Sequence, residues 1–149
     1  MSLVPSDWRG FTLIEILVVI TVIAILAGLV SPMVFRNVGD AKVTAARAQI
    51  ETFGLALDTY RMDNDYYPST EQGLAALQAF PGGEPLPRRW RGPYLKKAVP
   101  LDPWGSPYRY QSPGAINAQD YDLWSLGRDG KPGGAGEDQD LTSWEAAPK

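Results

Sequence analysis

The strongest constraint in this chain is a run of apolar residues near its N-terminus that contains a single carboxylate. The run extends from Phe11 to Val30 and is interrupted only by Thr12, Glu15, Thr21 and small residues. About twenty residues in a helix, rising about 1.5 Å each, are long enough to cross a bilayer core of roughly 30 Å. An ionised Glu15 inside that core costs about 2.5–3.5 kcal/mol unless it is paired, so its presence calls for a functional reason.

The residue that precedes the run offers a partner for this carboxylate. Cleavage after Gly10 leaves a free α-amino group on Phe11, which can pair with Glu15, and it removes a polar leader, residues 1–10. A secretory signal has its small-residue cleavage site after the apolar stretch, whereas here the glycine comes before it. The alternative is an ordinary single-pass anchor in which Glu15 snorkels to the membrane interface.

The composition excludes several classes of function. A chain of 149 residues with a net charge of −3 and no internal repeat predicts one anchored domain. No stripe of Lys and Arg is present to neutralise phosphates, so nucleic-acid binding is not expected. The absence of His and Cys removes histidine acid–base chemistry, thiolate nucleophiles and the usual zinc sites. Because no disulfide can form, some other clamp should stabilise the domain.

The spacing of apolar residues predicts that the helix continues well beyond the membrane. After Pro32, apolar residues recur mostly at intervals of three or four: Val34, Val38, Ala41, Ala45, Ala48, Ile50, Phe53, Leu57 and Tyr60. We predict a membrane segment over residues 11–32 and one helix from about Phe11 to Met62, on the order of 75 Å long. Pro32 lacks a backbone N–H and should kink the helix.

The remainder of the chain, residues 33–149, is predicted to form a small mixed domain around this helix. Ser69 or Thr70 should cap a short helix over Glu71–Phe80, with Leu74 and Leu77 packed on the long helix.

Further along, a turn is predicted at Asp102–Gly105, and two antiparallel strands are predicted at Tyr108–Gln111 and Asp120–Ser125. The basic run Arg88–Arg91 is interpreted as a solvated face.

The C-terminal region carries the other chemical feature of the chain. Asp129, Glu137, Asp138 and Asp140 lie in a Gly-rich segment, and such carboxylates repel one another unless a cation neutralises them. Oxygen-only ligands on a flexible loop favour Ca²⁺ over Mg²⁺, which demands stricter octahedral geometry. The alternative is a solvated acidic tail without a bound ion.

The segment Gly-Phe-Thr-Leu-Ile-Glu-Ile, which begins at Gly10, resembles the processing site of type IV pilins and type II secretion pseudopilins. The resemblance implies that a prepilin peptidase cuts between Gly10 and Phe11 and that Phe11 is then N-methylated. It also implies that Glu15 pairs with the amino terminus of a neighbouring subunit during assembly. The family's contacts between subunits further imply a pairing of Asp58 with Lys96 or Lys97 of a neighbour.

Landmarks beyond the helix resemble the major pseudopilin of type II secretion in particular. They are Tyr66-Tyr67-Pro68, Gln72-Gly73-Leu74, Tyr94-Leu95-Lys96-Lys97 and Asp102-Pro103-Trp104-Gly105. The resemblance implies an α+β, type IV pilin-like fold, in which a long N-terminal helix packs on a small antiparallel sheet with a calcium loop.

The same resemblance implies one Ca²⁺ in the acidic loop. Its ligands would match Asp129, the backbone carbonyl of Leu126, and Asp138 with Asp140. Many relatives carry two adjacent aspartates, whereas Gln139 separates them here. The choice among Glu137, Asp138 and Asp140 therefore stays open, with Asp129 and Asp140 as the safest pair.

The function implied by the resemblance is structural. The chain is expected to be the major subunit of a periplasmic pseudopilus whose growth drives export of folded proteins across the outer membrane, and it is not expected to be an enzyme. Expected partners are other copies of the chain, minor pseudopilins, the prepilin peptidase and the inner-membrane assembly platform. The anchor would cross the bacterial inner membrane once, with its N-terminus cytoplasmic and the C-terminal domain periplasmic. Alternatives are a type IV pilin for adhesion or motility and a membrane-tethered periplasmic enzyme.

Overall fold

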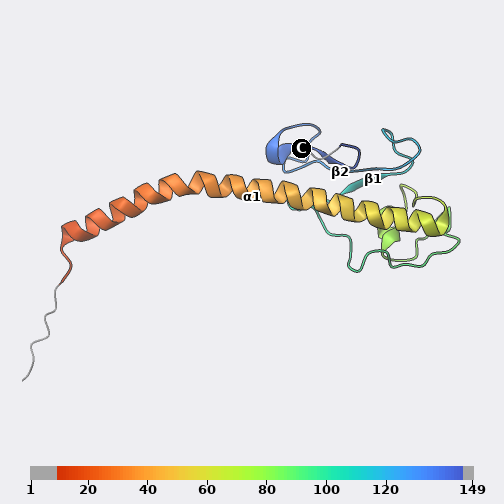
Figure 1. The fold of residues 1–149 in the computed structure, drawn as a ribbon, viewed down its shortest axis with the longest axis horizontal. Coiled ribbons are helices and arrows are strands. Elements are labelled where there is room, and N and C mark those ends of the chain that lie inside the picture. Colours follow the sequence, from red (N-terminus) through yellow and green to blue (C-terminus); the bar gives the residue numbers. More distant parts are fainter. Residues whose placement is uncertain (1–9, 146–149) are drawn as a thin grey trace, which may run out of the picture. The chain divides into compact units, whose positions relative to one another are not determined.

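The chain is built on one long helix, which the computed structural model shows together with a small sheet (Figure 1). The structure describes residues 10–145, except for the side chains of residues 31–36. Helix α1 runs from Leu13 to Asn64 and contains 52 residues. The prediction of a single helix is therefore confirmed, and each predicted end lies within two residues of the observed one. The kink expected at Pro32 falls on residues whose side chains lie outside the described part.

A capping box begins α1. The Thr12 hydroxyl accepts a hydrogen bond from the Glu15 backbone N–H at 3.2 Å, and the Glu15 carboxylate accepts one from the Thr12 N–H at 3.5 Å. This reciprocal pair gives the Thr12 N–H an acceptor and gives the Glu15 N–H a second one, besides the Thr12 carbonyl oxygen at 3.1 Å. The sequence Thr-x-x-Glu predicts such a box, and our sequence analysis did not identify it.

The other end of α1 is set by Asn64 and Asp65. The Asn64 side chain, which is fully buried, donates to the Tyr60 carbonyl at 2.9 Å and accepts from the Arg89 backbone N–H at 3.0 Å. Asp65 has a φ of 69°, in the left-handed region that ends many helices. The chain therefore leaves the helix at this point and starts the rest of the domain.

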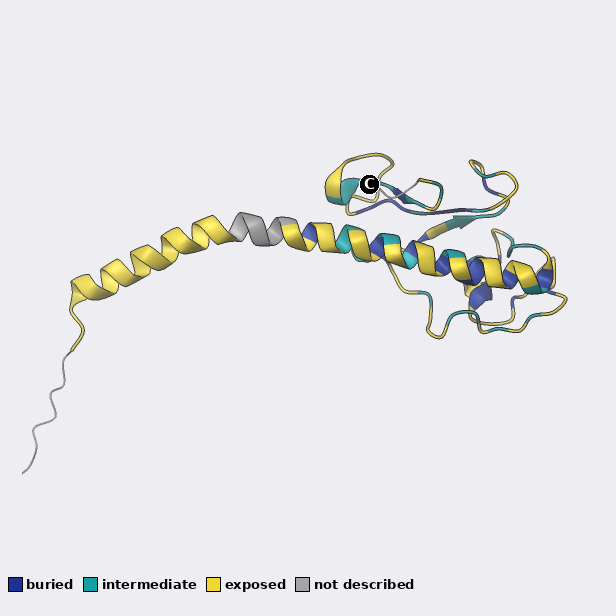
Figure 2. Cartoon of the chain, viewed as in Figure 1, coloured by how far each residue is buried: buried dark blue, intermediate teal, exposed yellow. Residues whose placement is uncertain are grey.

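The chain consists of two compact units, one over residues 1–38 and the other over Gly39–Lys149. In the first unit, the helical residues from Leu13 to Val30 are all exposed (Figure 2). By length and composition, this segment is apolar enough to cross a membrane. Side chains such as Leu13, 86% exposed, and Leu29, 72% exposed, find no cover within their own unit.

The second unit has a core formed by one face of α1 and by the segments that follow it. Its fully buried members include Phe53, Leu57 and Tyr60 from α1, together with Leu77, Leu123 and Leu141. The helical members recur at intervals of three or four, as expected for one face of a helix. Burial of each such side chain contributes about 1.5–3 kcal/mol to stability. Packing against this face of α1 therefore holds the segments around Leu77, Leu123 and Leu141 in place.

The segment after α1 corrects one prediction. A 3-10 helix of four residues, Leu74–Leu77, replaces the longer helix expected over Glu71–Phe80. Ser69 and Gln72 form a reciprocal pair in the turn before it, with N–H to side-chain distances of 3.0 and 3.3 Å, but the residue that caps the 3-10 helix is Gly73, so the predicted helix cap at Ser69 or Thr70 is wrong. Gly73 follows with a φ of 58°, which ends the first turn before an α-helix can extend. Leu74 and Leu77 are buried in the same core as α1, as predicted.

Three short strands form one antiparallel sheet in the order β1-β2-β3. Strands β1, Arg109–Gln111, and β2, Asp122–Ser125, confirm the predicted pair, with Tyr110 opposite Leu123. Strand β3, Leu141–Thr142, pairs with the end of β2 and was not predicted. A strand of two residues is too short to show an alternating pattern, so no sequence signal could identify it. Its position brings the end of the acidic segment back to the core.

Candidate functional site

The predicted processing site lies immediately before α1. Gly10 is exposed and outside regular structure, and nothing lies within 4 Å of the position that a Cβ would occupy there. Phe11 follows it with 76% of its surface exposed. The peptide bond between them is therefore free of packing against the described residues, as a protease substrate requires.

Glu15, the predicted assembly residue, lies in the first turn of α1 on the exposed apolar segment. Among the described residues, its carboxylate accepts one hydrogen bond, the long one from Thr12 given above. No basic side chain among the described residues forms a salt bridge with it. The carboxylate thus retains capacity for a cationic partner.

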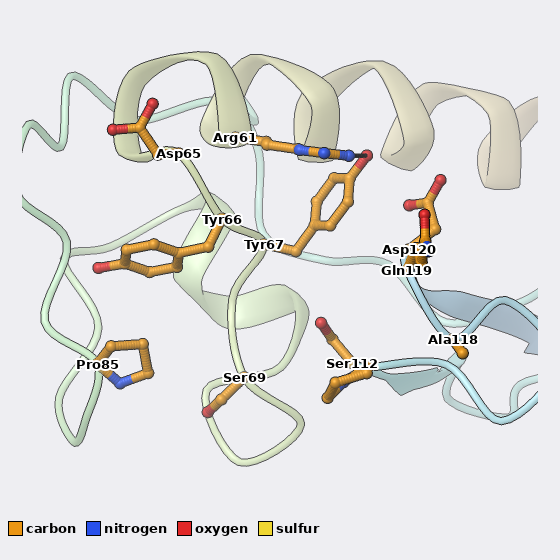
Figure 3. A pocket seen from close by; sticks show the side chains of 11 residues that line it. Arg61, Asp65, Tyr66, Tyr67, Ser69, Pro85, Ser112, Ala118, Gln119 and Asp120 are labelled. Carbon is orange, nitrogen blue, oxygen red and sulfur yellow. Dashed lines mark hydrogen bonds between the residues drawn. The ribbon is translucent and has the colours of Figure 1, made fainter.

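The second predicted assembly residue, Asp58, is already engaged within the chain. Its carboxylate accepts a hydrogen bond from the Tyr67 hydroxyl at 2.9 Å. Arg61 donates to the same hydroxyl at 3.3 Å, and its guanidinium lies 5.0 Å from the centre of the Tyr67 ring (Figure 3). Arg61 and Tyr67 line a pocket of about 340 Å³ together with Asp120, whereas Asp58 is not part of its lining.

Lys96 and Lys97, the predicted partners of Asp58 in a neighbouring subunit, belong to the long loop between the 3-10 helix and β1. Both are exposed. They line a groove of about 520 Å³ whose floor includes Phe53 of α1. Neither forms a salt bridge among the described residues, so both remain available to an acidic partner.

The acidic loop begins directly after β2. Leu126 and Gly127 are buried, and Gly127 has a φ of 67°. A Cβ at Gly127 would lie 2.6 Å from the Glu137 carbonyl oxygen, so the two ends of the loop approach each other at this glycine. The Arg128 N–H also donates to the Glu137 carbonyl at 2.8 Å. The loop is therefore closed by backbone contacts.

The four carboxylates of the loop fall into two groups, of which the first is paired with Arg128. Both oxygens of Asp138 accept from this guanidinium, at 2.9 Å from Nε and 3.0 Å from Nη2. Glu137 accepts from Nη1 at 3.4 Å and, with its other oxygen, from the Trp104 indole N–H at 3.1 Å. The hydrogen bond to Asp138, and then its charge, raise the pKa of Arg128 above its ordinary value.

The second group, Asp129 and Asp140, has no basic partner among the described residues. Asp129 accepts a hydrogen bond from the Lys131 N–H at 3.0 Å, and Asp140 accepts one from the Gly133 N–H at 2.9 Å. The other oxygen of Asp140, Oδ1, is buried and has no hydrogen-bond partner within the described part. A buried carboxylate oxygen without a donor is costly, and a bound cation or a water molecule would satisfy it.

The oxygen atoms predicted as ligands are of the kind that a hard cation such as Ca²⁺ prefers. They include the carboxylates of Asp129 and Asp140, which have no basic partner among the described residues, and the carbonyl of Leu126, all of them oxygen atoms on a loop with several glycines. Among the described residues, no group of three or more acidic side chains that could hold a metal occurs. A cation there would accordingly need backbone carbonyl oxygens or water besides Asp129 and Asp140.

One buried network near the loop was not identified from the sequence. Asp102, only 4% exposed, accepts hydrogen bonds from the backbone N–H groups of Trp104 and Ser106, at 3.1 and 2.8 Å. It also accepts from the Ser125 hydroxyl at 2.6 Å, and Ser125 Oγ in turn accepts from the Gly127 N–H at 3.2 Å. The predicted turn at residues 102–105 is confirmed, but nothing local in the sequence indicates that it also supports the acidic loop.

Comparison with known proteins decides the family. The model of type II secretion system (T2SS) protein G matches residues 33–144, and that of the prokaryotic N-terminal methylation motif matches residues 9–31. The chain belongs to the type II secretion protein G family. The predicted resemblance is thus confirmed over most of the chain.

Several relatives of the protein G family agree with this assignment. Type II secretion system core protein G of Pseudomonas aeruginosa is 50% identical over 137 residues, which cover 91% of this chain and 94% of that protein. The protein of the same name from Vibrio cholerae is 43% identical over 136 residues, covering 91% of this chain and 90% of the relative. The crystal structure of the major pseudopilin from the type 2 secretion system of enterohaemorrhagic Escherichia coli matches with a TM-score of 0.61 and 36% identity, over 72% of this chain and 90% of that one.

Membership of the protein G family confirms the main predictions. The fold is α+β and pilin-like, and the chain is a structural subunit of a type II secretion pseudopilus rather than an enzyme. The methylation motif and the apolar helix indicate a membrane-anchored component of the secretion system. The calcium loop and the roles of individual residues stay predictions.

Proposed function

We propose that this chain is the major subunit of a periplasmic pseudopilus, matured by cleavage between Gly10 and Phe11 and by N-methylation of Phe11. Growth of the fibre would drive folded proteins across the outer membrane. The observation that carries the proposal is the exposed apolar segment Leu13–Val30 in a pseudopilin chain. A surface of that size must be covered, by lipid before assembly and by the same segment of other subunits afterwards.

The proposed location follows from the same segment. The anchor crosses the inner membrane once, with the leader in the cytoplasm and residues 33–149 in the periplasm. In the cytoplasm the prepilin peptidase removes the leader, residues 1–10. The assembly platform in the inner membrane and the minor pseudopilins are the remaining proposed partners.

We assign the assembly contact at the N-terminus to Glu15. Its carboxylate lies in an apolar segment and has no basic partner among the described residues. The free amino group of Phe11 in a neighbouring subunit would neutralise it in a low-dielectric site, where an unpaired charge is costly. Asp58 and Lys96, with Lys97 as the alternative lysine, form a second and weaker proposed contact between subunits.

We also propose one Ca²⁺ in the acidic loop, held by Asp129, Asp140 and the Leu126 carbonyl. The unpartnered Oδ1 of Asp140 supports this assignment. Asp138 belongs to the ligands predicted from the sequence, but both of its oxygens already pair with Arg128. The ion would supply charge neutralisation and tie the loop to the core in a chain that has no disulfide.

Two substitutions at Glu15 test the assembly role. Glu15→Ala should leave membrane insertion intact, since it removes a charge from the bilayer, and should abolish fibres. Glu15→Gln keeps an acceptor for the Thr12 N–H and thus the capping box, but loses the charge. If pairing with an amino terminus is the role of Glu15, the Gln variant should also fail to form fibres.

Fibre yield after overproduction, seen by electron microscopy and by crosslinking, measures the outcome. Mass spectrometry of the membrane-extracted chain checks in parallel that it begins at N-methylated Phe11. Normal fibres from Glu15→Gln would mean that Glu15 only caps its own helix. A chain that keeps residues 1–10 would contradict the proposed maturation.

A further inference from the structure

We propose that Arg128 is a resident cation of the acidic loop, which keeps Glu137 and Asp138 folded against the core without calcium and confines calcium to Asp129 and Asp140. The inference rests on the calcium site proposed above, and it concerns the part of the loop that calcium would not touch. In this role Arg128 is a positioning residue, because it acts through two carboxylates rather than on a ligand.

The geometry at Arg128 is that of a built ion cluster. Its guanidinium forms a fork with the two oxygens of Asp138, at 2.9 and 3.0 Å, and reaches Glu137 at 3.4 Å. A planar fork of this kind fixes orientation as well as charge, which a lysine cannot do. The two carboxylates are largely covered, with 25% and 32% of their side-chain surfaces exposed. The Arg128 side chain itself is 56% exposed, so solvent still screens the charge of this cluster in part, and the fork geometry carries the argument.

Glu137 carries the effect of Arg128 to the core. Its second oxygen accepts from the Trp104 indole N–H at 3.1 Å. Its side chain also fills the space over Gly39 of α1, where a Cβ would lie 2.6 Å from Oε1. The short 3-10 helix Gly136–Asp138 is thus anchored to the 102–105 turn and to α1 through one side chain. None of these contacts needs a metal ion.

The salt bridges of Arg128 also make the two halves of the acidic loop differ in electrostatic potential. Arg128 donates hydrogen bonds to Glu137 and Asp138, and its charge acts more weakly on Asp129. Among the described residues, the hydrogen bonds that Asp129 and Asp140 accept come from backbone N–H groups. An incoming divalent cation is attracted most strongly to carboxylates that no other cation neutralises. Arg128 therefore selects which half of the loop binds calcium.

The test compares the full-length chain in detergent micelles with Arg128→Gln and with Arg109→Gln. Arg109 is exposed on β1 and forms no salt bridge among the described residues, so its variant controls for the change in net charge. In excess chelator, Arg128→Gln should melt roughly 4–8 °C below Arg109→Gln, and amide exchange should rise over residues 136–141. In the chain with Arg128 intact, chelation should raise exchange over residues 129–135 and leave residues 136–141 protected.

A double-mutant cycle separates the ion cluster from a general loss of packing. Asp138→Asn alone should lower the melting temperature in chelator. In the double variant with Arg128→Gln, the total loss of melting temperature should be much smaller than the sum of the two single losses. Additive effects, or equal melting and exchange for Arg128→Gln and Arg109→Gln in chelator, would overturn the proposal. Arg128→Lys should be intermediate, since it keeps the charge and loses the fork.

The two proposals fail in different ways. If calcium has no effect on the unsubstituted chain but Arg128→Gln is destabilised in chelator, the calcium site is wrong and the anchoring role of Arg128 is supported. If calcium stabilises the chain and Arg128→Gln behaves like its control, the calcium site stands and the role of Arg128 is wrong.

Discussion

At the scale of single residues, two glycines of the acidic loop show how the same backbone conformation has different consequences. Gly127 and Gly130 have φ values of 67° and 65°, so both occupy the left-handed region. A Cβ at Gly127 would meet the carbonyl oxygens of Glu137 and Gln139 at 2.6 and 2.7 Å, whereas nothing lies within 4 Å at Gly130. Only Gly127 is required both for its conformation and for the close approach of the loop ends.

We therefore predict unequal costs for alanine at these two positions. Gly130→Ala should cost about 1–2 kcal/mol, the strain of an L-residue in the left-handed region. Gly127→Ala should cost about 1–3 kcal/mol more, because backbone atoms must move to admit the methyl group. Thermal unfolding of the two full-length variants in chelator measures the difference without any contribution from calcium. Equal melting temperatures would mean that the loop ends do not meet as described.

A second residue-scale prediction concerns the contact proposed between subunits at Asp58. Because Asp58 already accepts from Tyr67, a neighbour's lysine must share the carboxylate, and exposed pairs contribute only about 0–1 kcal/mol. Asp58→Lys should reduce fibre yield, and Lys96→Asp in the same chain should restore part of it. Lys97→Asp serves as the matched alternative. Failure of both lysine reversals to restore fibres would argue against the contact.

At the scale of elements, the acidic loop combines few apolar contacts with four carboxylates, of which two form salt bridges with Arg128. Its ends are anchored by β2, by β3 and by the Asp102 network, whereas residues 128–136 are exposed. Such a segment opens at low free-energy cost unless a ligand holds it. Calcium binding should therefore change the stability of this element most.

The corresponding prediction is a calcium-dependent melting temperature. A site that binds only the folded state adds about 2.7 kcal/mol at a hundredfold excess over its dissociation constant, which should raise the melting temperature by more than about 5 °C. Asp129→Asn keeps the acceptor for the Lys131 N–H but loses the charge, and it should abolish most of the rise. Asp65→Asn, at an exposed position whose left-handed backbone suits asparagine, should respond to calcium like the unsubstituted chain.

The measurement is thermal unfolding of the full-length chain in detergent, with chelator, with millimolar Ca²⁺ and with equal Mg²⁺. Magnesium should restore much less stability, because the loop does not offer a rigid octahedral set of ligands. If the melting curve does not move between chelator and calcium, the loop is a solvated acidic segment and the assignment fails.

At the scale of the whole molecule, the second unit gathers all seven tyrosines of the chain, and none lies in the apolar N-terminal segment. Burial is the largest cause that raises the pKa of each of them, to about 12 for Tyr60, Tyr67 and Tyr108. Their aromatic contacts link α1 to the loops, for example Tyr60 with Tyr94 at 5.4 Å between ring centres. Tyr60 and Tyr108 are buried in the core, and the other five tyrosines are half-buried and pack against it.

This arrangement predicts cooperative unfolding in alkali. A phenol titrates near pH 10 in the unfolded chain, and the raised pKa in the folded state means that the unfolded chain loses its protons first. Stability should be unaffected by the tyrosines below about pH 10 and should fall as the pH rises through about 12. Tyrosinate absorbance and circular dichroism during alkaline titration should change together.

Two phenylalanine variants sharpen this alkaline prediction. The Tyr60 hydroxyl is buried and has no hydrogen-bond partner among the described residues, so Tyr60→Phe should leave stability at neutral pH unchanged or raised and should move alkaline unfolding to higher pH. Tyr110 donates to the Pro68 carbonyl at 2.8 Å, so Tyr110→Phe should lower stability at neutral pH by about 1 kcal/mol. Tyrosines that titrate near pH 10 in the folded chain would contradict the prediction.

The amino-acid sequence alone is sufficient to predict the features that depend on residues close to one another along the chain. The spacing of Phe53, Leu57 and Tyr60 predicts α1, and the apolar run around Glu15 predicts the membrane segment, because both patterns repeat within a few residues. The motif at Gly10 and the landmarks after the helix are likewise local, and they were enough to predict the family and the fold.

Tertiary structure decided which carboxylates of the acidic loop are paired. Arg128 meets Asp138 ten positions away, and Trp104 meets Glu137 thirty-three positions away, and both contacts exist only because the loop closes. Strand β3 depends in the same way on pairing with β2, since two residues have no period of their own. A sequence contains the charges, but the closure of the chain determines which of them neutralise one another and which stay free to bind an ion.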